Sequence, residues 1–171
     1  MAEDPLVDLA GRLGASCLAR DVRVATVESC TGGLVGHVIT EVPGSSRYYA
    51  GGFVTYSNDV KHLVVGVPQD VLAFHGAVSA QTAMAMATGG RERTGADLAV
   101  AVTGIAGPDG GTDEKPVGLT YVAVADAVGL AVRRHVWTGD RSANKRSSAE
   151  AALELLLERV EAAGAVTPDR A

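Results

Sequence analysis

The chain has 171 residues, 47% of them hydrophobic, which is enough for one domain with a sizeable core. Its net charge is −5 and no run of lysine and arginine exceeds two residues. A nucleic-acid partner is therefore disfavoured, because binding to a phosphate backbone needs a concentrated basic face. No apolar stretch is long enough to span a membrane and the N-terminus lacks a signal-peptide core, so we expect a soluble, cytoplasmic protein without a membrane partner.

The first half of the chain predicts helices that alternate with strands. Leucines recur at helical spacing behind Pro5, and Gly51 and Gly52 weaken the beginning of the second strand. In chain order, the predicted elements are a helix at 5–20, a strand at 23–27, a helix at 34–42, a strand at 52–56 and short helices at 58–65 and 68–74.

The second half predicts a capped helix, three strands and a closing helix. Ser79 is placed to cap the first helix, and residues 96–103 form the continuous apolar run that is typical of a buried strand. In chain order, the predicted elements are a helix at 79–94, a strand at 96–103, a loop at 104–116, a hairpin of strands at 117–125 and 130–137, and a helix from about 142 to 163 that begins after an Asp140 cap. We expect Gly164 to end the last helix and the tail to fray.

This order of elements predicts an α/β fold, namely a single three-layer α/β/α domain with a mixed β-sheet. The sequence contains no repeat, low-complexity block or interdomain linker. We therefore expect residues 1–171 to form one domain with its core at about 5–163.

The cysteines and histidines give no sign of a metal centre. Cys17 and Cys30 form neither a CxxC pair nor a disulfide framework. The histidines, none of which has a metal-ligand spacing, are His37, His62, His75 and His135. We expect no metal and no cofactor.

A glycine-rich turn connects the first predicted strand to a helix. Its glycines leave backbone N–H groups available at a helix start, which favours anions and developing oxyanions. The turn can equally be a plain helix cap, and it is not a Walker A loop, because no Lys-Ser/Thr pair follows the glycines. Cys30 is a weak candidate nucleophile, since no histidine lies near it in sequence. The predicted substrate contacts of this turn are Ser29, Cys30, Thr31, Gly32 and Gly33.

Ser46 and Lys61 are a second candidate, as nucleophile and base. A serine hydroxyl needs a base to take its proton, and a desolvated lysine amine can be that base. The commoner role of Ser45 and Ser46 is to cap a short helix, but we also predict that Ser45 contacts substrate. A strand of five residues would separate the pair by about 16 Å, so they meet only if residues 47–51 fold back or a neighbouring chain supplies the lysine.

The long loop at 104–116 is either a lid over a site at the same sheet edge or a solvated surface loop. Two glycine-rich loops that follow two core strands favour a shared pocket. Arg141 and Arg146 are either surface charges or a clamp for a phosphate. The substrate contacts predicted in these segments are Thr103, Gly104, Gly107, Arg141 and Arg146.

Six stretches that occur in the same order resemble the CinA carboxy-terminal family, over residues from about 5 to about 163. They are ESCTGG (28–33), GSSRYYAGGFVTYSNDVK (44–61), HGAVS (75–79), VTGIAGPDGG (102–111), KPVG (115–118) and GDR (139–141). Together they are far more specific than a lone glycine pattern. The chain resembles the short, single-domain form of that family.

The resemblance implies a metal-independent hydrolase of pyridine nucleotide salvage, which deamidates nicotinamide mononucleotide to nicotinate mononucleotide and ammonia. The family's proposed catalytic serine and lysine map onto Ser46 and Lys61, and its tyrosine maps onto Tyr56. In the implied mechanism Lys61 takes the proton of Ser46, which attacks the amide and forms an acyl-enzyme.

Two other interpretations stay open. The chain can be a non-catalytic ligand-binding or regulatory module, as the family's competence- and damage-linked naming suggests, although an intact Ser46, Tyr56 and Lys61 argue against a decayed site. It can also be an amidase for a different small amide. Flat apolar strands and alanine-rich helices favour a homodimer.

Overall fold

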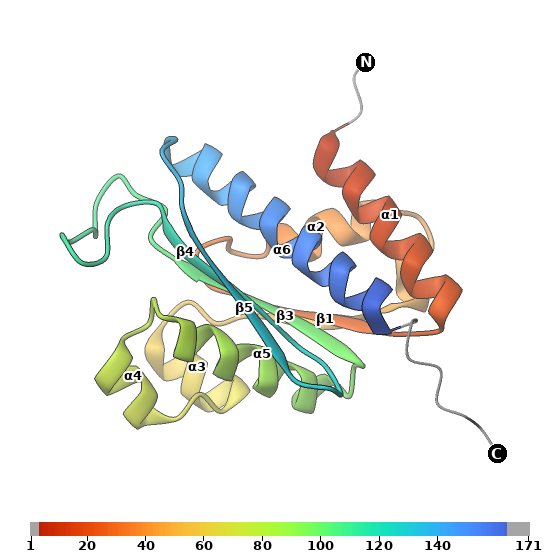
Figure 1. The fold of residues 1–171 in the computed structure, drawn as a ribbon, viewed down its shortest axis with the longest axis horizontal. Helices are drawn as coiled ribbons and strands as arrows, with labels where there is room; N and C mark the ends of the chain where they lie inside the picture. Colours follow the sequence, from red (N-terminus) through yellow and green to blue (C-terminus); the bar gives the residue numbers. More distant parts are fainter. Residues whose placement is uncertain (1–3, 164–171) are drawn as a thin grey trace.

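The computed structural model describes residues 4–163 and places a five-stranded sheet between two layers of helices (Figure 1). The predicted three-layer α/β/α fold with a mixed sheet is therefore confirmed. The elements are α1 (Pro5–Arg20), β1 (Val24–Glu28), α2 (Leu34–Glu41), the 3-10 turn η1 (Ser45–Arg47), β2 (Tyr49–Val54), α3 (Asn58–Val65), α4 (Gln69–His75), α5 (Ala80–Thr94), β3 (Leu98–Gly104), β4 (Leu119–Ala125), β5 (Leu130–Val136) and α6 (Arg141–Ala163).

The strands lie in the order β2-β1-β3-β4-β5. β1 runs parallel to both β2 and β3, whereas β4 is antiparallel to β3 and to β5. Every residue of β1 is buried, as is every residue of β3 except the last. Strands covered on both faces are expected to be apolar throughout, which explains why their sequences do not alternate.

Two clusters of buried side chains attach the helices to the sheet. The larger cluster packs α1, α2 and α6 on one face, around side chains such as Leu13, Ile39 and Leu156. The smaller packs α3, α4 and α5 on the other face, where Val65 and Met86 are buried. Burying a leucine, isoleucine or methionine side chain of this kind stabilises a fold by about 1.5–3 kcal/mol.

β2 begins three residues before the predicted strand. The sequence placed that strand at 52–56 because paired glycines weaken strands, whereas β2 spans Tyr49–Val54. Gly52 has a packing role that its sequence context does not reveal. A Cβ at Gly52 would lie 2.2 Å from Thr26 Oγ1 and 2.5 Å from Tyr49 Oη, and these two hydroxyls hydrogen-bond to each other at 2.7 Å.

The predicted caps and hairpin are confirmed. Ser79 Oγ accepts a hydrogen bond from Thr82 N at 3.1 Å, and Asp140 Oδ1 accepts one from Ala143 N at 2.8 Å. Asp126 N donates to Gly129 O where β4 turns into β5. The predicted end at Gly164 and the tail lie outside the described residues. Within those residues, no helix combines the length and the apolar character that crossing a membrane requires.

The close approach of α5 to α3 at Gly89 gives a test of the packing. A Cβ at Gly89 would lie 1.7 Å from Val65 O, so Gly89→Ala must push the two helices apart. We expect the free energy of unfolding to fall by about 1–3 kcal/mol, as measured by chemical denaturation. Gly11→Ala in α1 is the matched control, because nothing lies within 4 Å of the added Cβ. It should raise stability by about 0.5–1 kcal/mol, and an equal loss in both variants would contradict the packing described.

Candidate active site

The carboxyl ends of three adjacent parallel strands meet at one edge of the sheet. β2, β1 and β3 are neighbours in that order, and each is followed by a polar segment at this edge. A cavity of about 240 Å³ lies there, lined by Ser29 after β1, by Tyr56 and Lys61 after β2, and by Thr103 at the end of β3. The carboxyl edge of an open α/β sheet is where such folds bind ligands.

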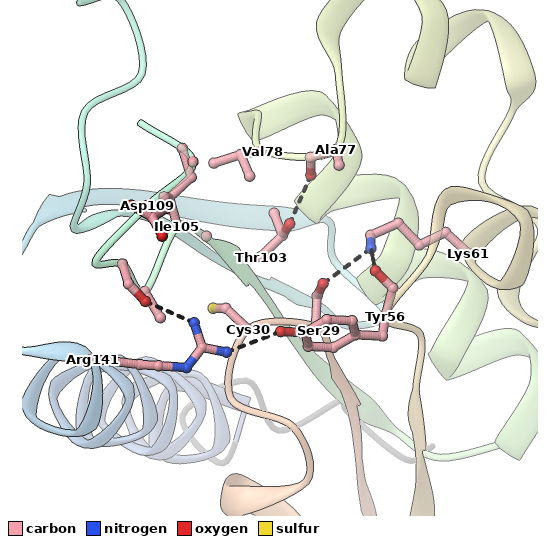
Figure 2. A pocket seen from close by; sticks show the side chains of 14 residues that line it. Ser29, Cys30, Tyr56, Lys61, Ala77, Val78, Thr103, Ile105, Asp109 and Arg141 are labelled. Carbon is pink, nitrogen blue, oxygen red and sulfur yellow. Dashed lines mark hydrogen bonds between the residues drawn. The ribbon is translucent and has the colours of Figure 1, made fainter. Parts of the chain in front are cut away.

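Lys61 projects from α3 to the wall of this cavity and is only 1% exposed. Its Nζ donates to Ser29 Oγ at 3.0 Å, to Thr55 O at 2.7 Å and to Tyr56 O at 3.2 Å. Figure 2 shows the amine directed at the Ser29 hydroxyl beside the cavity. The two carbonyl oxygens can only accept hydrogen bonds. In the neutral amine both hydrogens can therefore go to the carbonyls, which leaves the lone pair facing Ser29.

The buried position of Lys61 changes its proton affinity. Desolvation disfavours the ammonium form and lowers the pKa of Lys61 from 10.5 to about 8. A substantial fraction of the side chain is then neutral in mildly alkaline solution. A neutral amine in contact with a serine hydroxyl can act as a general base.

Ser29 is held by backbone hydrogen bonds on both sides. Its N–H donates to Val102 O of β3, and its carbonyl accepts from Gly32 N. The preceding carbonyl, that of Glu28, accepts from Thr55 N beyond β2. These bonds fix the serine between the ends of two neighbouring strands, where it is 8% exposed.

The buried carboxylate of Glu28 occupies the amino-terminal end of α2. Its two oxygens accept hydrogen bonds from Val35 N at 2.8 Å and from Gly36 N at 3.0 Å. An external anion therefore cannot use these N–H groups, and the predicted anion position at the start of this helix is filled from within the chain. Cys30 N and Thr31 N, in contrast, donate to no backbone acceptor among residues 4–163.

The structure does not bring Ser46 to Lys61 within the chain, so of the two routes that the sequence left open, the fold-back of residues 47–51 does not occur, and the pairing would need a lysine from a neighbouring chain. Ser46 lies exposed in η1, before the amino end of β2, whereas Lys61 follows its carboxyl end. The six residues of β2 separate these ends by about 20 Å, because residues 49–51 of the segment that was required to fold back belong to the strand. Ser45 likewise lies in η1, away from the cavity.

Arg141 joins two walls of the cavity. Its guanidinium donates from Nη1 to Gly107 O at 2.8 Å and from Nη2 to Tyr56 Oη at 3.1 Å. The Tyr56 hydroxyl therefore faces Arg141, while its backbone carbonyl faces Lys61 (Figure 2). The loop that contains Gly107 lines the cavity from Ile105 to Gly107 and at Asp109 and Gly110, which agrees with its prediction as part of the site.

The other predicted contacts divide into two groups. Those that line the cavity are Ser29, Cys30, Thr103, Gly104, Gly107 and Arg141. Those that do not line it are Thr31, Gly32, Gly33, Ser45 and Arg146. Arg146 Nη2 instead contacts Asp4 Oδ1 at 2.7 Å in an exposed ion pair, so the structure gives it no place in a phosphate clamp at the cavity.

Sequence reasoning missed the Ser29–Lys61 contact and the wall formed by Ala77 and Val78. Thr103 Oγ1 donates to Ala77 O at 2.7 Å and holds that wall in place. The signal for the contact was present in the sequence, since Ser29 and Lys61 each follow a predicted strand. Their strands become neighbours only in the folded sheet.

Cys30 is an inert thiol in this site. Burial raises its pKa to about 11, so the thiol stays protonated at neutral pH. The second cysteine, Cys17, is also buried and has a pKa raised by desolvation to about 12. Among the described residues, no group of three or more histidine, cysteine, aspartate or glutamate side chains is arranged to hold a metal ion.

Comparisons with known protein sequences place these features in a family. The model of the CinA C-terminal domain matches residues 7–160. The chain is 46% identical over 157 residues to "Nicotinamide-nucleotide amidohydrolase PncC" of Escherichia coli K12, covering 91% of this chain and 95% of that protein. It is 50% identical to a "CinA-like protein" of Geobacter sulfurreducens over 82% of this chain but only 34% of that relative, so it spans about a third of the length of that longer protein.

Solved structures agree with the fold. A CinA superfamily protein from Klebsiella pneumoniae superposes with a TM-score of 0.88 at 33% identity, covering 92% of this chain and 98% of that one. The competence/damage-inducible protein CihA from Agrobacterium tumefaciens superposes with a TM-score of 0.86 at 42% identity, with the same coverage of the two chains.

The Ser29–Lys61 contact predicts which serine is reactive. A serine-directed fluorophosphonate should modify Ser29, because Lys61 can take its proton, and should leave the exposed Ser46 unmodified. The modified residue can be identified by peptide mass spectrometry. The labelling rate should rise as pH increases through about 8, where Lys61 loses its proton. An adduct on Ser46 with none on Ser29 would exclude the arrangement described.

Proposed function

This chain belongs to the CinA C-terminal domain family, and on that basis we propose that it is an amidohydrolase that converts nicotinamide mononucleotide to nicotinate mononucleotide and ammonia. The identity of 46% to an amidohydrolase along nearly its whole length supports this reaction. The observation that carries the proposal is the 3.0 Å contact between Lys61 Nζ and Ser29 Oγ beside the cavity. We also propose that the protein is cytoplasmic and that it forms a homodimer.

Ser29 is the nucleophile in this mechanism and Lys61 is its base. The neutral amine of Lys61 takes the proton of Ser29 Oγ as that oxygen attacks the carboxamide carbon. The carbonyls of Thr55 and Tyr56 hold the amine by accepting its hydrogen bonds. Lys61 becomes an ammonium in this step, and the same carbonyls stabilise the new positive charge.

The turn after Ser29 supplies the oxyanion site. Attack on the amide moves negative charge to its oxygen, and N–H groups already in place stabilise that charge without reorganisation. Cys30 N and Thr31 N adjoin the nucleophile and have no backbone acceptor among the described residues. They are the donors that we assign to the oxyanion.

Lys61 then returns its proton to the amide nitrogen. Ammonia leaves only when this nitrogen is protonated, because an amide anion is a very poor leaving group. The nicotinoyl ester of Ser29 remains, and the neutral Lys61 next activates a water molecule that attacks it. The products are the carboxylate, ammonia and a regenerated serine, so one water is consumed for each amide.

The substrate itself favours the active protonation state. The pyridine ring of nicotinamide mononucleotide carries a positive charge, and its carboxamide must lie beside Lys61 in order to react. A like charge close by disfavours the ammonium form, so substrate binding lowers the pKa of Lys61 further. A neutral pyridine amide lacks this effect.

Replacement of each serine separates the two candidate nucleophiles. Ser29→Ala should reduce ammonia release from nicotinamide mononucleotide by at least about 1,000-fold, because the acyl-enzyme cannot form. Ser46→Ala is the matched control and should retain activity within about two-fold, since Ser46 lies exposed before the other end of β2. The measurement is a coupled ammonia assay. Full activity in Ser29→Ala would refute the mechanism, and binding of the mononucleotide without turnover by the wild type would favour the regulatory module.

The dependence of kcat/KM on pH tests the base. Because Lys61 must be neutral and has its pKa lowered to about 8, kcat/KM should increase with pH and level off above about 8. Cys30→Ala should leave this profile in place, since the pKa of that thiol is raised to about 11. A kcat/KM that is independent of pH between about 6 and 9 would exclude Lys61 as the base.

A further inference from the structure

Among the described residues, the cations of the cavity and of the segments next to it have partners within the chain, with one exception. Lys61 has three acceptors, and Arg141 contacts Gly107 O and Tyr56 Oη. Lys115 Nζ donates to His75 O at 2.6 Å, and Arg146 is paired with Asp4. Each of these side chains has a defined partner within the chain.

Lys145 is the exception. It is half-buried on α6, and within residues 4–163 its ammonium makes no hydrogen bond and has no carboxylate within 4.0 Å. Its side chain extends to the turn that follows Ser29, where a Cβ on Gly32 would lie 3.8 Å from Lys145 Nζ. Lysine side chains are seldom withdrawn from water without a negative partner.

Lys145 is also close enough to the cavity to affect a residue that lines it. Burial raises the pKa of Cys30, and the positive charges of Lys61 and Lys145 both act in the opposite direction. Arg141 precedes Lys145 by one helical turn, so the two cations share a face of α6. Lys145 therefore extends the positive side of the site beyond Arg141.

The carboxylates of the surrounding segments form no ion pair with Lys145, so an anion can bind beside its ammonium. Glu28, which directly precedes the turn that Lys145 reaches, already accepts hydrogen bonds from two N–H groups of α2. Asp109 lines the cavity from the loop after β3, and Asp140 caps α6 through Ala143 N. None of these carboxylates forms an ion pair with Lys145. An ammonium that forms no ion pair among the described residues is stabilised when a negative group binds to it.

We propose that Lys145 binds the phosphate of the mononucleotide substrate and so selects phosphorylated over unphosphorylated nucleosides. This inference rests on the function proposed above. The carboxamide and the phosphate lie at opposite ends of the substrate, separated by the pyridine ring and the ribose. The cation for the phosphate must therefore lie outside the Ser29–Lys61 contact, and Lys145, which reaches the turn at Gly32 and acts on the cavity-lining Cys30, is placed for that role.

The test compares two neighbouring cations by ligand binding. Lys145→Met and, as the matched control, Arg146→Gln are each introduced into Ser29→Ala, which removes turnover. Each variant loses one positive charge, but Arg146 is committed to Asp4 away from the cavity. Dissociation constants for nicotinamide mononucleotide and for nicotinamide riboside are measured by calorimetry. Lys145→Gln is a second variant in case Lys145→Met does not fold, as judged by its melting temperature.

Lys145→Met should weaken binding of the mononucleotide by about 10- to 100-fold, the range expected for a charge-assisted contact, and change riboside binding by less than about two-fold. Arg146→Gln should change neither. Equal losses of affinity for both ligands would mean that Lys145 has a structural role. An unchanged affinity for the mononucleotide would mean that Lys145 has no role in binding it. Either result overturns the inference. Because binding is measured without turnover, the outcome is separate from the question of whether the wild type releases ammonia.

Discussion

Burial of an ammonium group removes its hydration and costs several kcal/mol, so the position of Lys61 requires compensation elsewhere in the fold. Two backbone carbonyls and one hydroxyl surround its Nζ within 3.2 Å. The remaining cost appears as the lowered pKa. This cost supports the proposed role of the amine as a base, because a fully hydrated lysine near neutral pH has no lone pair to offer Ser29.

The sheet topology brings the proposed base and the proposed nucleophile together. β1 lies between β2 and β3, so Ser29 at the end of β1 is next to the segment that leads from β2 to Lys61. Glu28 stabilises the same region by filling the amino-terminal end of α2 with its own carboxylate. This internal anion fixes the turn after Ser29, and it leaves side-chain cations rather than that helix to bind the phosphate of the proposed substrate.

Local sequence patterns predicted much of the fold, because apolar strands and capped helices are encoded by short segments. The same patterns predicted as site residues Ser29, Lys61, Thr103 and the loop that contains Gly107, all of which line the cavity. They failed where partners depend on strand order or helix phase. Ser46 is nearer to Lys61 in sequence than Ser29 is, yet Ser46 lies before the amino end of β2 and Lys61 follows its carboxyl end. Lys145 and Arg146 are adjacent but point about 100° apart around α6, and only contacts in the folded chain tell them apart.

The proposed mechanism requires that Lys61 be an amine with a lowered pKa in contact with Ser29. The most direct measurement is an NMR titration of the Lys61 side chain in the free protein, with Lys61→Arg used to assign the signal. A midpoint at about 8 is the predicted result. A midpoint near 10.5, the ordinary value for lysine, would contradict the account, because Lys61 would then be an ammonium at the pH where it must accept a proton.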